Sequence, residues 1–517
     1  MRILDWSGLL PAEVTADWSD VIAVLSGIYG EPSRARLERQ KKVEIGTGQS
    51  PLSEDEIRAM PVEEAARQIA SWRPDPNEWL VSARELGRTL EAVVKTDPAS
   101  WASEPLKIVG LLHHPTYIHH YLRGLATADN LAGVPTDKLF DAIALMRTRP
   151  WAATPLGNAN FDFDADWRGA EGASVDLIKS LADSDHGFAD RRDEAWSILR
   201  TEVSRREEPS GIVDGARDPL ESAINRPCTR ALEAVLSFMG HEFRAEQVVR
   251  PDAFGLLESV LRLVDSDGAE HRAIIAPRIG FLRHIAPDWV DQHRARLLGD
   301  AAPDGLGQLT VDLALKWGQP NNWLLEQFVH QVKDAVRREV DNALEHYLIA
   351  ILREIPGYKI SDAVGFLSSL NKLSAAGEAL GRLLRADDAP ASVVTVATEF
   401  WSQALRAHRR EDLAGFGWFS EISVLDDAAW ADLTLQTLTA NHGRIDWAHR
   451  VAERASSIPP TPVTLGILNE LVRGLPDEWD RRQVAETAVS VLNEATALSD
   501  TPEYQRLRTT LLERGLL

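Results

Sequence analysis

The stretch TPVTLGILNELVRGL, residues 461–475, decides the fold class because it contains a complete α-helix signal. Thr461 is a preferred N-cap residue, and Pro462 suits the first turn, where its missing N–H leaves no hydrogen bond unmade. Apolar side chains then recur at the 3.6-residue period of a helix and form one face, made of Leu465, Leu468, Leu471 and Val472. This segment predicts an amphipathic helix that packs against other helices.

The same pattern is found along most of the chain. In DAFGLLESVLRLV, residues 252–264, the predicted apolar stripe consists of Phe254, Leu257, Val260, Leu261 and Val264. Ser53 and Glu56 have the spacing of a capping box, and Thr501 with Pro502 repeats the Thr-Pro start. The β-branched run ASVVTVA, residues 391–397, lies between helical segments, and we interpret it as buried helix.

Frequent helix breakers and the chain length together predict the architecture. Pro, Gly and Asp interrupt the helical pattern roughly every 15–25 residues, which leaves room for roughly 25 helices of ordinary length. The 517 residues exceed the roughly 250–300 that one core accommodates. We therefore expect an all-α fold, an α-solenoid of antiparallel helix pairs with degenerate HEAT-like repeats.

We expect one continuous solenoid with three blocks of helical repeats. The N-terminal block covers residues 1–160 and the C-terminal block covers residues 301–517. The central block covers residues 161–300 and includes a loop at 205–219, which is rich in charge, Pro and Gly.

Tryptophan is unusually frequent, with 16 Trp against 6 Tyr. A short motif accounts for part of this excess, because a Pro or Asp turn repeatedly places Trp in the first turn of a helix. It occurs as DPNEW (75–79), DPASW (97–101), APDW (286–289), QPNNW (319–323) and LPDEW (475–479). We interpret it as structural, since a large ring there can pack back on the preceding helix. The alternative is a row of exposed aromatic residues on a binding surface.

Composition disfavours several classes of function. The formal net charge of −22 disfavours non-specific binding to nucleic acid or to anionic membranes, although a local basic groove would be compatible with it. The sequence has no run of about 20 apolar residues and no recognisable signal peptide, so we expect a cytoplasmic protein without a membrane span. The single cysteine, Cys228, allows no intrachain disulfide and no cysteine-based zinc site, and we expect it to be a small buried residue.

Four of the 14 histidines lie within LLHHPTYIHHYLRGL, residues 111–125. The proline after His114 predicts a turn and then a helix, whose buried stripe consists of Ile118, Tyr121, Leu122 and Leu125. His119 and His120 are adjacent and diverge by about 100° on a helix, whereas helical metal ligands are three or four residues apart. We therefore expect no metal site. His113 and His114 would bracket the turn, and the other two would face solvent.

The remaining motifs are incomplete. DFDADWRGAEGA, residues 162–173, begins like a calcium loop, but Trp167 replaces the required Gly and Ala173 replaces the final acid. The glycine-rich GTGQS lacks the Gly-Lys-Ser/Thr of a phosphate loop. Ser369 and Lys372 match an SxxK motif whose companion motifs are missing. We assign no catalytic, cofactor-binding or metal-binding residue and expect that the chain is not an enzyme.

Three stretches together carry a family resemblance: LHHPTYIHHYLRGLATA (112–128), residues 164–238, and RIGFLRHIAPDWVDQHRARLLG (278–299). The most specific piece is DP-x-x-x-AIN-x-x-x-x-RALEA, residues 218–234. They resemble the helical C-terminal repeat region of large bacterial antiphage-defence NTPases (STAND-like) and SIR2-type proteins. In those proteins the region is thought to sense a phage component or to scaffold assembly. Their catalytic parts lie outside the matched stretches, so the resemblance implies no catalytic residue here.

The combined expectation is a non-enzymatic α-helical repeat scaffold or sensor without a cofactor. Its partner would be a protein, namely an effector, an NTPase or a phage component, and the resemblance implies bacterial antiphage defence as the setting. Which residues bind that partner is unknown from the sequence. Two alternatives remain open. One is an enzyme, such as a nuclease or hydrolase, with a scattered active site. The other is a nucleic-acid-binding solenoid with an Arg/Lys stripe.

Overall fold

A computed structural model describes residues 49–73, 81–131, 133–149, 167–184, 187–205, 218–385, 389–407, 413–474 and 478–517. Within these ranges it contains 27 α-helices, several short 3-10 helices and no strand. One isolated bridge joins Gln49 to Val81. The predicted all-α fold is confirmed. None of the helices in these ranges has the length and apolar character needed to cross a membrane.

The chain divides into two compact units. The first consists of Met1–Ile212 and Asn225–Glu246, and the second of Val213–Ile224 and Gln247–Leu517. The three expected blocks and their joining into one solenoid stay predictions. Of the predicted loop at 205–219, residues 206–217 lie outside the described ranges.

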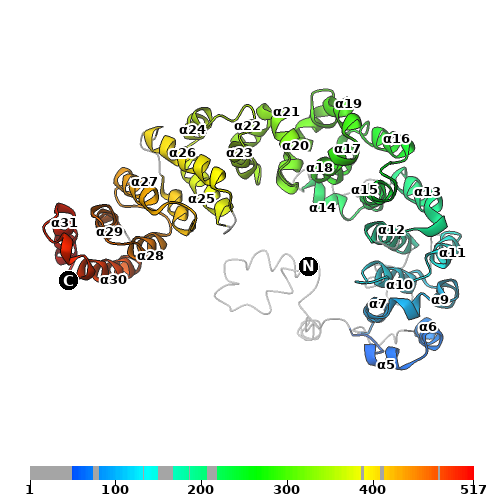
Figure 1. Ribbon diagram of the computed structural model, residues 1–517. Helices are drawn as coiled ribbons and strands as arrows, with labels where there is room; N and C mark the ends of the chain where they lie inside the picture. Colours follow the sequence, from blue (N-terminus) through cyan, green and yellow to red (C-terminus); the bar gives the residue numbers. More distant parts are fainter. Residues whose placement is uncertain are drawn as a thin grey trace, which may run out of the picture. The chain divides into compact units, whose positions relative to one another are not determined.

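The first unit stacks its helices in two rows. They are α5 (Glu54–Ala59), α6 (Val62–Ser71), α7 (Ala83–Thr96), α8 (Pro98–Trp101), α9 (Pro105–Leu112), α10 (Pro115–Ala126), α11 (Thr136–Arg147), α12 (Trp167–Asp183), α13 (Arg192–Val203) and α15 (Pro227–Glu246). In one row α10 packs between α7 and α12, and α12 packs against α15 (Figure 1). In the other row α9 packs between α6 and α11. Each helix therefore buries its apolar side against neighbours from successive pairs.

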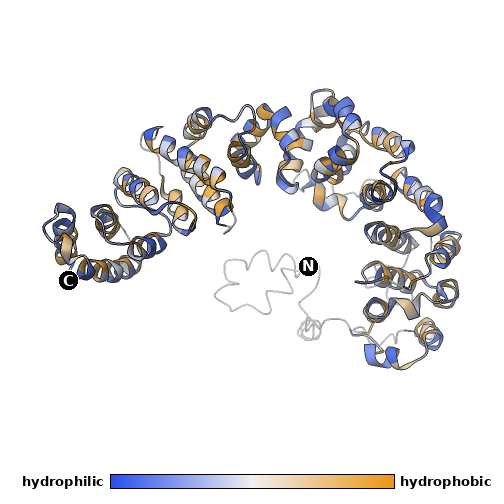
Figure 2. Cartoon of the chain, viewed as in Figure 1, coloured by the Kyte–Doolittle hydropathy of each residue, from blue (hydrophilic) through white to orange (hydrophobic). Residues whose placement is uncertain are grey.

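The second unit is longer and is built in the same way. Its helices are α14 (Pro219–Ala223), α16 (Pro251–Val260), α17 (Asp265–Ile275), α18 (Ile279–Ile285), α19 (Pro287–Leu298), α20 (Leu306–Trp317), α21 (Asn322–Gln327), α22 (Val329–Arg337), α23 (Ala343–Leu352), α24 (Ile360–Ser369), α25 (Leu373–Leu384), α26 (Ala391–Ala407), the 3-10 helix η5 (Ala414–Glu421), α27 (Asp427–Ala440), α28 (Ala448–Ser457), α29 (Pro462–Gly474), α30 (Glu478–Glu494) and α31 (Pro502–Glu513). One row runs α20, α23, α25, η5, α27, α29 and α31, each packed on the next. Figure 2 shows hydrophobic and hydrophilic residues mixed within these helices, as one-sided burial requires.

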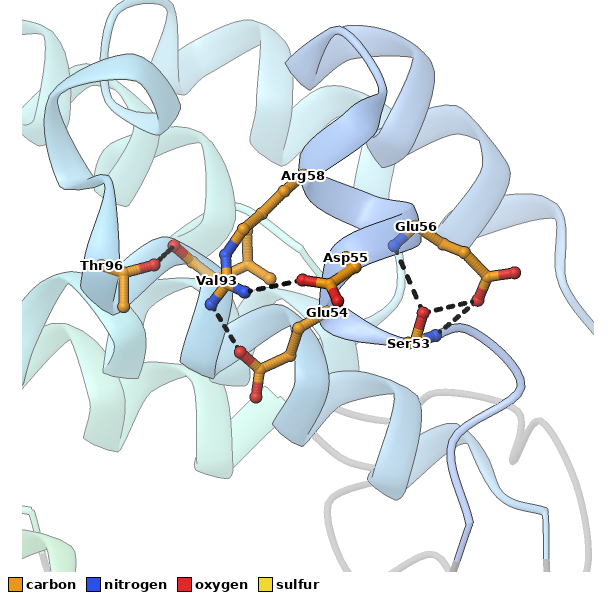
Figure 3. A network of polar contacts seen from close by, with 7 residues as sticks. All are labelled: Ser53, Glu54, Asp55, Glu56, Arg58, Val93 and Thr96. Carbon is orange, nitrogen blue, oxygen red and sulfur yellow. Dashed lines mark hydrogen bonds and ion pairs between the residues drawn. The ribbon is translucent and has the colours of Figure 1, made fainter.

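The predicted helix starts are found where the sequence places them. The Ser53 backbone N–H donates to Glu56 Oε2 at 2.8 Å, and the Glu56 N–H donates to Ser53 Oγ at 3.3 Å, which completes the capping box (Figure 3). Thr461 Oγ1 accepts from the Thr464 N–H at 3.2 Å, and Thr501 caps α31 in the same way. The β-branched run begins α26 and is helical, as predicted, but it is not a buried segment, since only Val394 and Ala397 of it are buried.

The apolar stripe of α29 is fully buried, because Leu465, Leu468, Leu471 and Val472 are each 0% exposed. The stripe predicted for 252–264 is partly wrong. Helix α16 ends at Val260, so Val264 lies beyond it and is 44% exposed. Helix α16 begins at Pro251. The residues of this helix that are buried are Ala253, Leu256, Leu257 and Val260. Phe254 is only half-buried.

Two described tryptophans of the Pro-Trp motif, Trp101 and Trp289, are buried, as a structural role predicts, and each also has an aromatic neighbour beyond the preceding helix. Trp101 on α8 is buried; its ring lies 6.5 Å from that of Tyr121 on α10, two helices further on, and its backbone carbonyl accepts from the Tyr121 hydroxyl. Trp289 on α19 is buried, and its ring lies 5.6 Å from that of Phe254 on α16, three helices back. Trp323 is half-buried. The side chains of the other two tryptophans of the motif, Trp79 and Trp479, lie outside the described part of the chain.

A fully buried guanidinium joins four helices of the second unit. Arg272 on α17 donates to the carbonyls of Leu261, Arg296 and Leu297 at 3.2, 3.0 and 2.8 Å, and to Thr310 Oγ1 at 3.2 Å. These carbonyls lie at the ends of α16 and α19, where the helix itself offers them no donor and where a cation is favoured. Burial lowers the pKa of Arg272 to about 10, so it remains charged at neutral pH.

Candidate interaction surface

The histidine-rich stretch forms a buried helix contact. The predicted turn is confirmed, because α10 begins directly after His114, whose Nδ1 accepts from the Thr116 N–H at 3.3 Å. The predicted stripe of this helix is also buried. His113 is exposed and precedes that turn.

The prediction that His119 and His120 face solvent is wrong, since they are only 8% and 3% exposed. Helix α10 is covered by α7 on one side and by α12 on the other, so little of it reaches solvent. His120 Nδ1 lies 2.7 Å from Glu91 Oε2 on α7, and His119 Nδ1 lies 2.8 Å from the Gly169 carbonyl on α12. Burial acts to raise the pKa of Glu91, but the hydrogen bond from His120 and the charge of Arg123 lower it overall.

The other motifs also occupy ordinary structural positions. Trp167 is the first residue of α12 and is buried, so the second half of the calcium-like stretch is helix. Residues 162–166, and the three first residues of GTGQS, lie outside the described ranges. Ser369 donates to the Phe366 carbonyl, and Lys372 forms an ion pair with Glu339 at 2.7 Å. Cys228 is buried in α15, as predicted. Among the described residues, no three His, Cys, Asp or Glu side chains gather as metal ligands would.

Two tryptophans form a half-exposed aromatic surface in the second unit. The ring centroids of Trp418 and Trp447 are 4.2 Å apart, and the ring of His449 stacks beside Trp447 at 6.0 Å. All three side chains are half-buried, so part of each ring surface meets solvent. We call Trp418, Trp447 and His449 the tryptophan platform.

The local sequence AGFGWFSE explains how Trp418 comes to the surface. It forms η5, in which residues three apart share a face. Phe416 and Phe419 lie on the inner face and pack on the buried ring of Trp401, with centroids 5.4 and 4.8 Å away. Trp418 lies between them in sequence and therefore on another face of η5.

Glycines on α25 allow η5 to approach closely. A Cβ added at Gly381 would overlap Cβ of Trp418, and one added at Gly377 would come within 2.8 Å of Phe416. These two glycines are four residues apart and therefore lie on one face of α25. The position of the Trp418 backbone thus depends on the absence of side chains at two sites of the facing helix.

The backbone of Trp447 is left-handed, with φ 57° and ψ 36°, at the N-cap of α28. This conformation costs an ordinary residue roughly 1–2 kcal/mol relative to a right-handed one. The preceding Asp446 N–H donates to the Ala414 carbonyl of η5 at 3.0 Å, which ties the two segments together. Strained residues of this kind are concentrated at functional sites.

Charged side chains surround the platform. The guanidinium of Arg385 lies 5.7 Å from the centroid of the Trp447 ring and forms an ion pair with Glu421 at 2.7 Å. Arg450 lies 3.5 Å from Glu421 and 2.8 Å from Glu453. An aromatic centre with a charged rim is the usual anatomy of a protein interface.

A half-buried arginine holds the end of η5 beneath this surface. Arg454 donates to the carbonyls of Phe419, Ile422 and Leu425 at 3.0, 2.9 and 2.7 Å. Its guanidinium carbon lies 4.7 Å from the centre of the Trp430 ring. Burial lowers the pKa of Arg454. The platform therefore lies on a segment whose backbone carbonyls are held by a side chain of α28.

Sequence reasoning missed the platform. Its two tryptophans belong to none of the Pro-Trp motifs that we considered, and the segments that carry them are separated by a complete helix. The density of glycine and aromatic residues in AGFGWFSE was the available signal. No family model, curated protein or solved structure matches this chain. We therefore infer the function of this chain from the geometry of its described residues.

Proposed function

We propose that this chain is a non-enzymatic helical scaffold or sensor that binds a protein partner through the tryptophan platform. The observation that carries the proposal is the half-exposed pair of Trp418 and Trp447, held in place by a buried frame. Tryptophan and arginine are enriched among residues that dominate binding energy, and a rigid site loses little entropy on association. Arg385 and Arg450 supply the charged rim for orientation.

A purely structural explanation would be that the two rings only cover the end of the core. The backbone of Trp447 argues against it. Gly or Asn would occupy a left-handed N-cap at lower cost, and a bulky aromatic residue there needs a compensating benefit. Partner binding would supply that benefit.

The setting of antiphage defence is proposed from the sequence resemblance alone. The matched stretches lie within residues 112–299, whereas the platform lies within residues 418–449. The stretches that carry the resemblance and the residues of the platform thus lie in different parts of the chain. On this proposal the partner is an effector, an NTPase or a phage component.

The direct test is affinity purification of the tagged full chain from its host, before and after phage challenge, with mass spectrometry of co-purifying proteins. A stoichiometric effector, NTPase or phage protein would support the proposal and identify the partner. A chain purified alone in both conditions would contradict it. A chain purified with nucleic acid instead would favour the nucleic-acid-binding alternative.

A further inference from the structure

Two cations of α22 lie over one aromatic ring of α24. The Lys333 Nζ lies 5.9 Å and the Arg337 guanidinium carbon 5.1 Å from the centroid of Phe366. Lys333 is half-buried and Arg337 is exposed. The two residues are four apart on α22, so their side chains are neighbours on the same face.

Neither cation forms an ion pair within the described part of the chain. The adjacent Arg338 shows the contrast, since it pairs with Asp312 at 2.7 Å and with Asp334 at 2.8 Å. Like charges four residues apart destabilise a helix, and a cation–π contact offsets the charge only in part. This positive pair is therefore only partly compensated, in a chain whose formal net charge is −22.

The ring of Phe366 is held from the inside. Its ring centroid lies 5.4 Å from the ring centroid of Tyr347 on α23, and Tyr347 is 0% exposed. Phe366 itself is half-buried, so part of it remains available beside the two cations. The surface thus combines a fixed apolar element with two positive charges.

A third unpaired cation belongs to the same pair of helices. Lys359 is exposed and is the N-cap residue of α24. The start of α24 lies beside the start of α22, because a Cβ at Gly357 would contact Val329 at 3.1 Å. Positive side chains therefore occur at both ends of this helix pair.

The helix dipole explains only part of the arrangement. Arg337 lies in the last turn of α22, where a cation interacts favourably with the exposed carbonyls. Lys333 lies in the middle of the helix and gains nothing comparable. A charge that is unpaired and unfavourable for folding is better explained by a ligand that neutralises it.

We propose that the α22–α24 surface, formed by Lys333, Arg337 and Phe366, binds an acidic segment of a protein partner. Carboxylates of that segment would pair with the two cations, and an apolar side chain would contact Phe366. The two cations of this surface, even together with Lys359, are fewer than the six to ten phosphate contacts of a protein whose nucleic-acid affinity depends strongly on salt. The negative field of the whole chain would oppose a long polyanion more than a short acidic peptide. This surface is separate from the tryptophan platform, and its test does not depend on that platform.

The test is fluorescence anisotropy of the full chain with a labelled peptide of Glu and Gly residues around one central Leu. The comparison peptide has Gln in place of every Glu. We expect the Glu peptide to bind, the Gln peptide to bind at least about tenfold more weakly, and added salt to weaken binding. The double variant Lys333→Gln/Arg337→Gln should lose affinity for the Glu peptide by about tenfold.

The control double variant Lys95→Gln/Arg200→Gln removes the same charge from two exposed positions of the first unit. It should bind as the wild type does. Phe366→Leu keeps an apolar side chain on Tyr347 but removes the ring, and it should weaken binding of the Glu peptide. Absence of binding by the Glu peptide would overturn the proposal, as would an equal loss in the control variant. Tighter binding of a labelled single-stranded DNA of the same length would overturn it in favour of nucleic acid.

Discussion

At the scale of single residues, burial determines which ionisable side chains stay charged. Arg272 remains charged because four oxygens surround its guanidinium. His346 on α23 shows the opposite behaviour, since it is 5% exposed and burial lowers its pKa to about 4. Arg272 therefore stabilises the fold as a cation, and His346 does so as a neutral ring.

His346 makes stability depend on pH. Its folded pKa of about 4 is below the ordinary value of 6.5, so its stabilising contribution is complete above about pH 6.5 and is lost as pH falls toward 4. Between pH 7 and pH 4 we expect the wild type to lose about 3 kcal/mol more unfolding free energy than His346→Gln. Urea unfolding of both proteins at the two pH values measures this. Equal losses would show that His346 does not titrate between folded and unfolded states in this way.

Arg272→Met should destabilise the second unit by about 3–5 kcal/mol, because it leaves buried carbonyls without donors. Arg272→Lys should recover only part of this, since an ammonium cannot reach oxygens on three other helices at once. The matched control is Arg296→Met, because Arg296 is exposed beside the same helix end. It should change the unfolding free energy by no more than about 0.5 kcal/mol. Chemical denaturation compares the three, and equal effects of the two Met variants would refute the role of Arg272.

At the scale of elements, close approach between helices depends on where side chains are absent. Helix α25 presents Gly377 and Gly381 to η5, and α10 presents almost no free face because α7 and α12 cover it. In α25, packing on η5 outweighs the low helix propensity of glycine. In α10, packing on two neighbouring helices buries positions that the helix alone would leave exposed. The same glycines would be unfavourable in a solvent-exposed helix.

Gly381→Ala therefore tests the packing of η5 on α25. Helix propensity alone would make Ala stabilising by about 1 kcal/mol, but the added Cβ would overlap Trp418. We expect net destabilisation by about 1–3 kcal/mol and a change in tryptophan fluorescence. Gly365→Ala on α24 is the control, because nothing lies within 4 Å of its Cβ position, and it should be stabilising. Stabilisation by both substitutions would mean that η5 does not approach α25 as described.

At the scale of the whole molecule, sequence reasoning predicts what is local and misses what distant segments decide. The cap at Thr461 and the stripe from Leu465 to Val472 depend on neighbours within two or three turns, and both are correct. The burial of His120 depends on Glu91, 29 residues away, and that of His119 on Gly169, 50 residues away. Hydrophobic periodicity contains no information about such contacts. It therefore predicted helix α10 correctly, but it did not predict that the side of α10 carrying these histidines is buried as well.

The candidate site was beyond local reasoning for the same reason. The platform forms because η5 and the start of α28 lie in contact. The Asp446 N–H donates a hydrogen bond to the Ala414 carbonyl, and the Arg454 guanidinium donates one to the Phe419 carbonyl. No short motif encodes that meeting. The excess of tryptophan was visible in the composition, but only packing determines which rings reach the surface.

The most direct test of partner binding compares quantitative mass spectrometry of proteins that co-purify with the wild type, with Trp418→Ala/Trp447→Ala and with Trp317→Ala. Trp317 is 47% exposed and lies outside the platform, so it is a matched control. A fourth sample, Arg385→Glu, changes only an exposed rim residue and guards against misfolding of the double variant. We expect one stoichiometric partner with the wild type and the control, reduced at least about tenfold in both platform variants. Equal recovery from all four proteins would contradict partner binding at the platform.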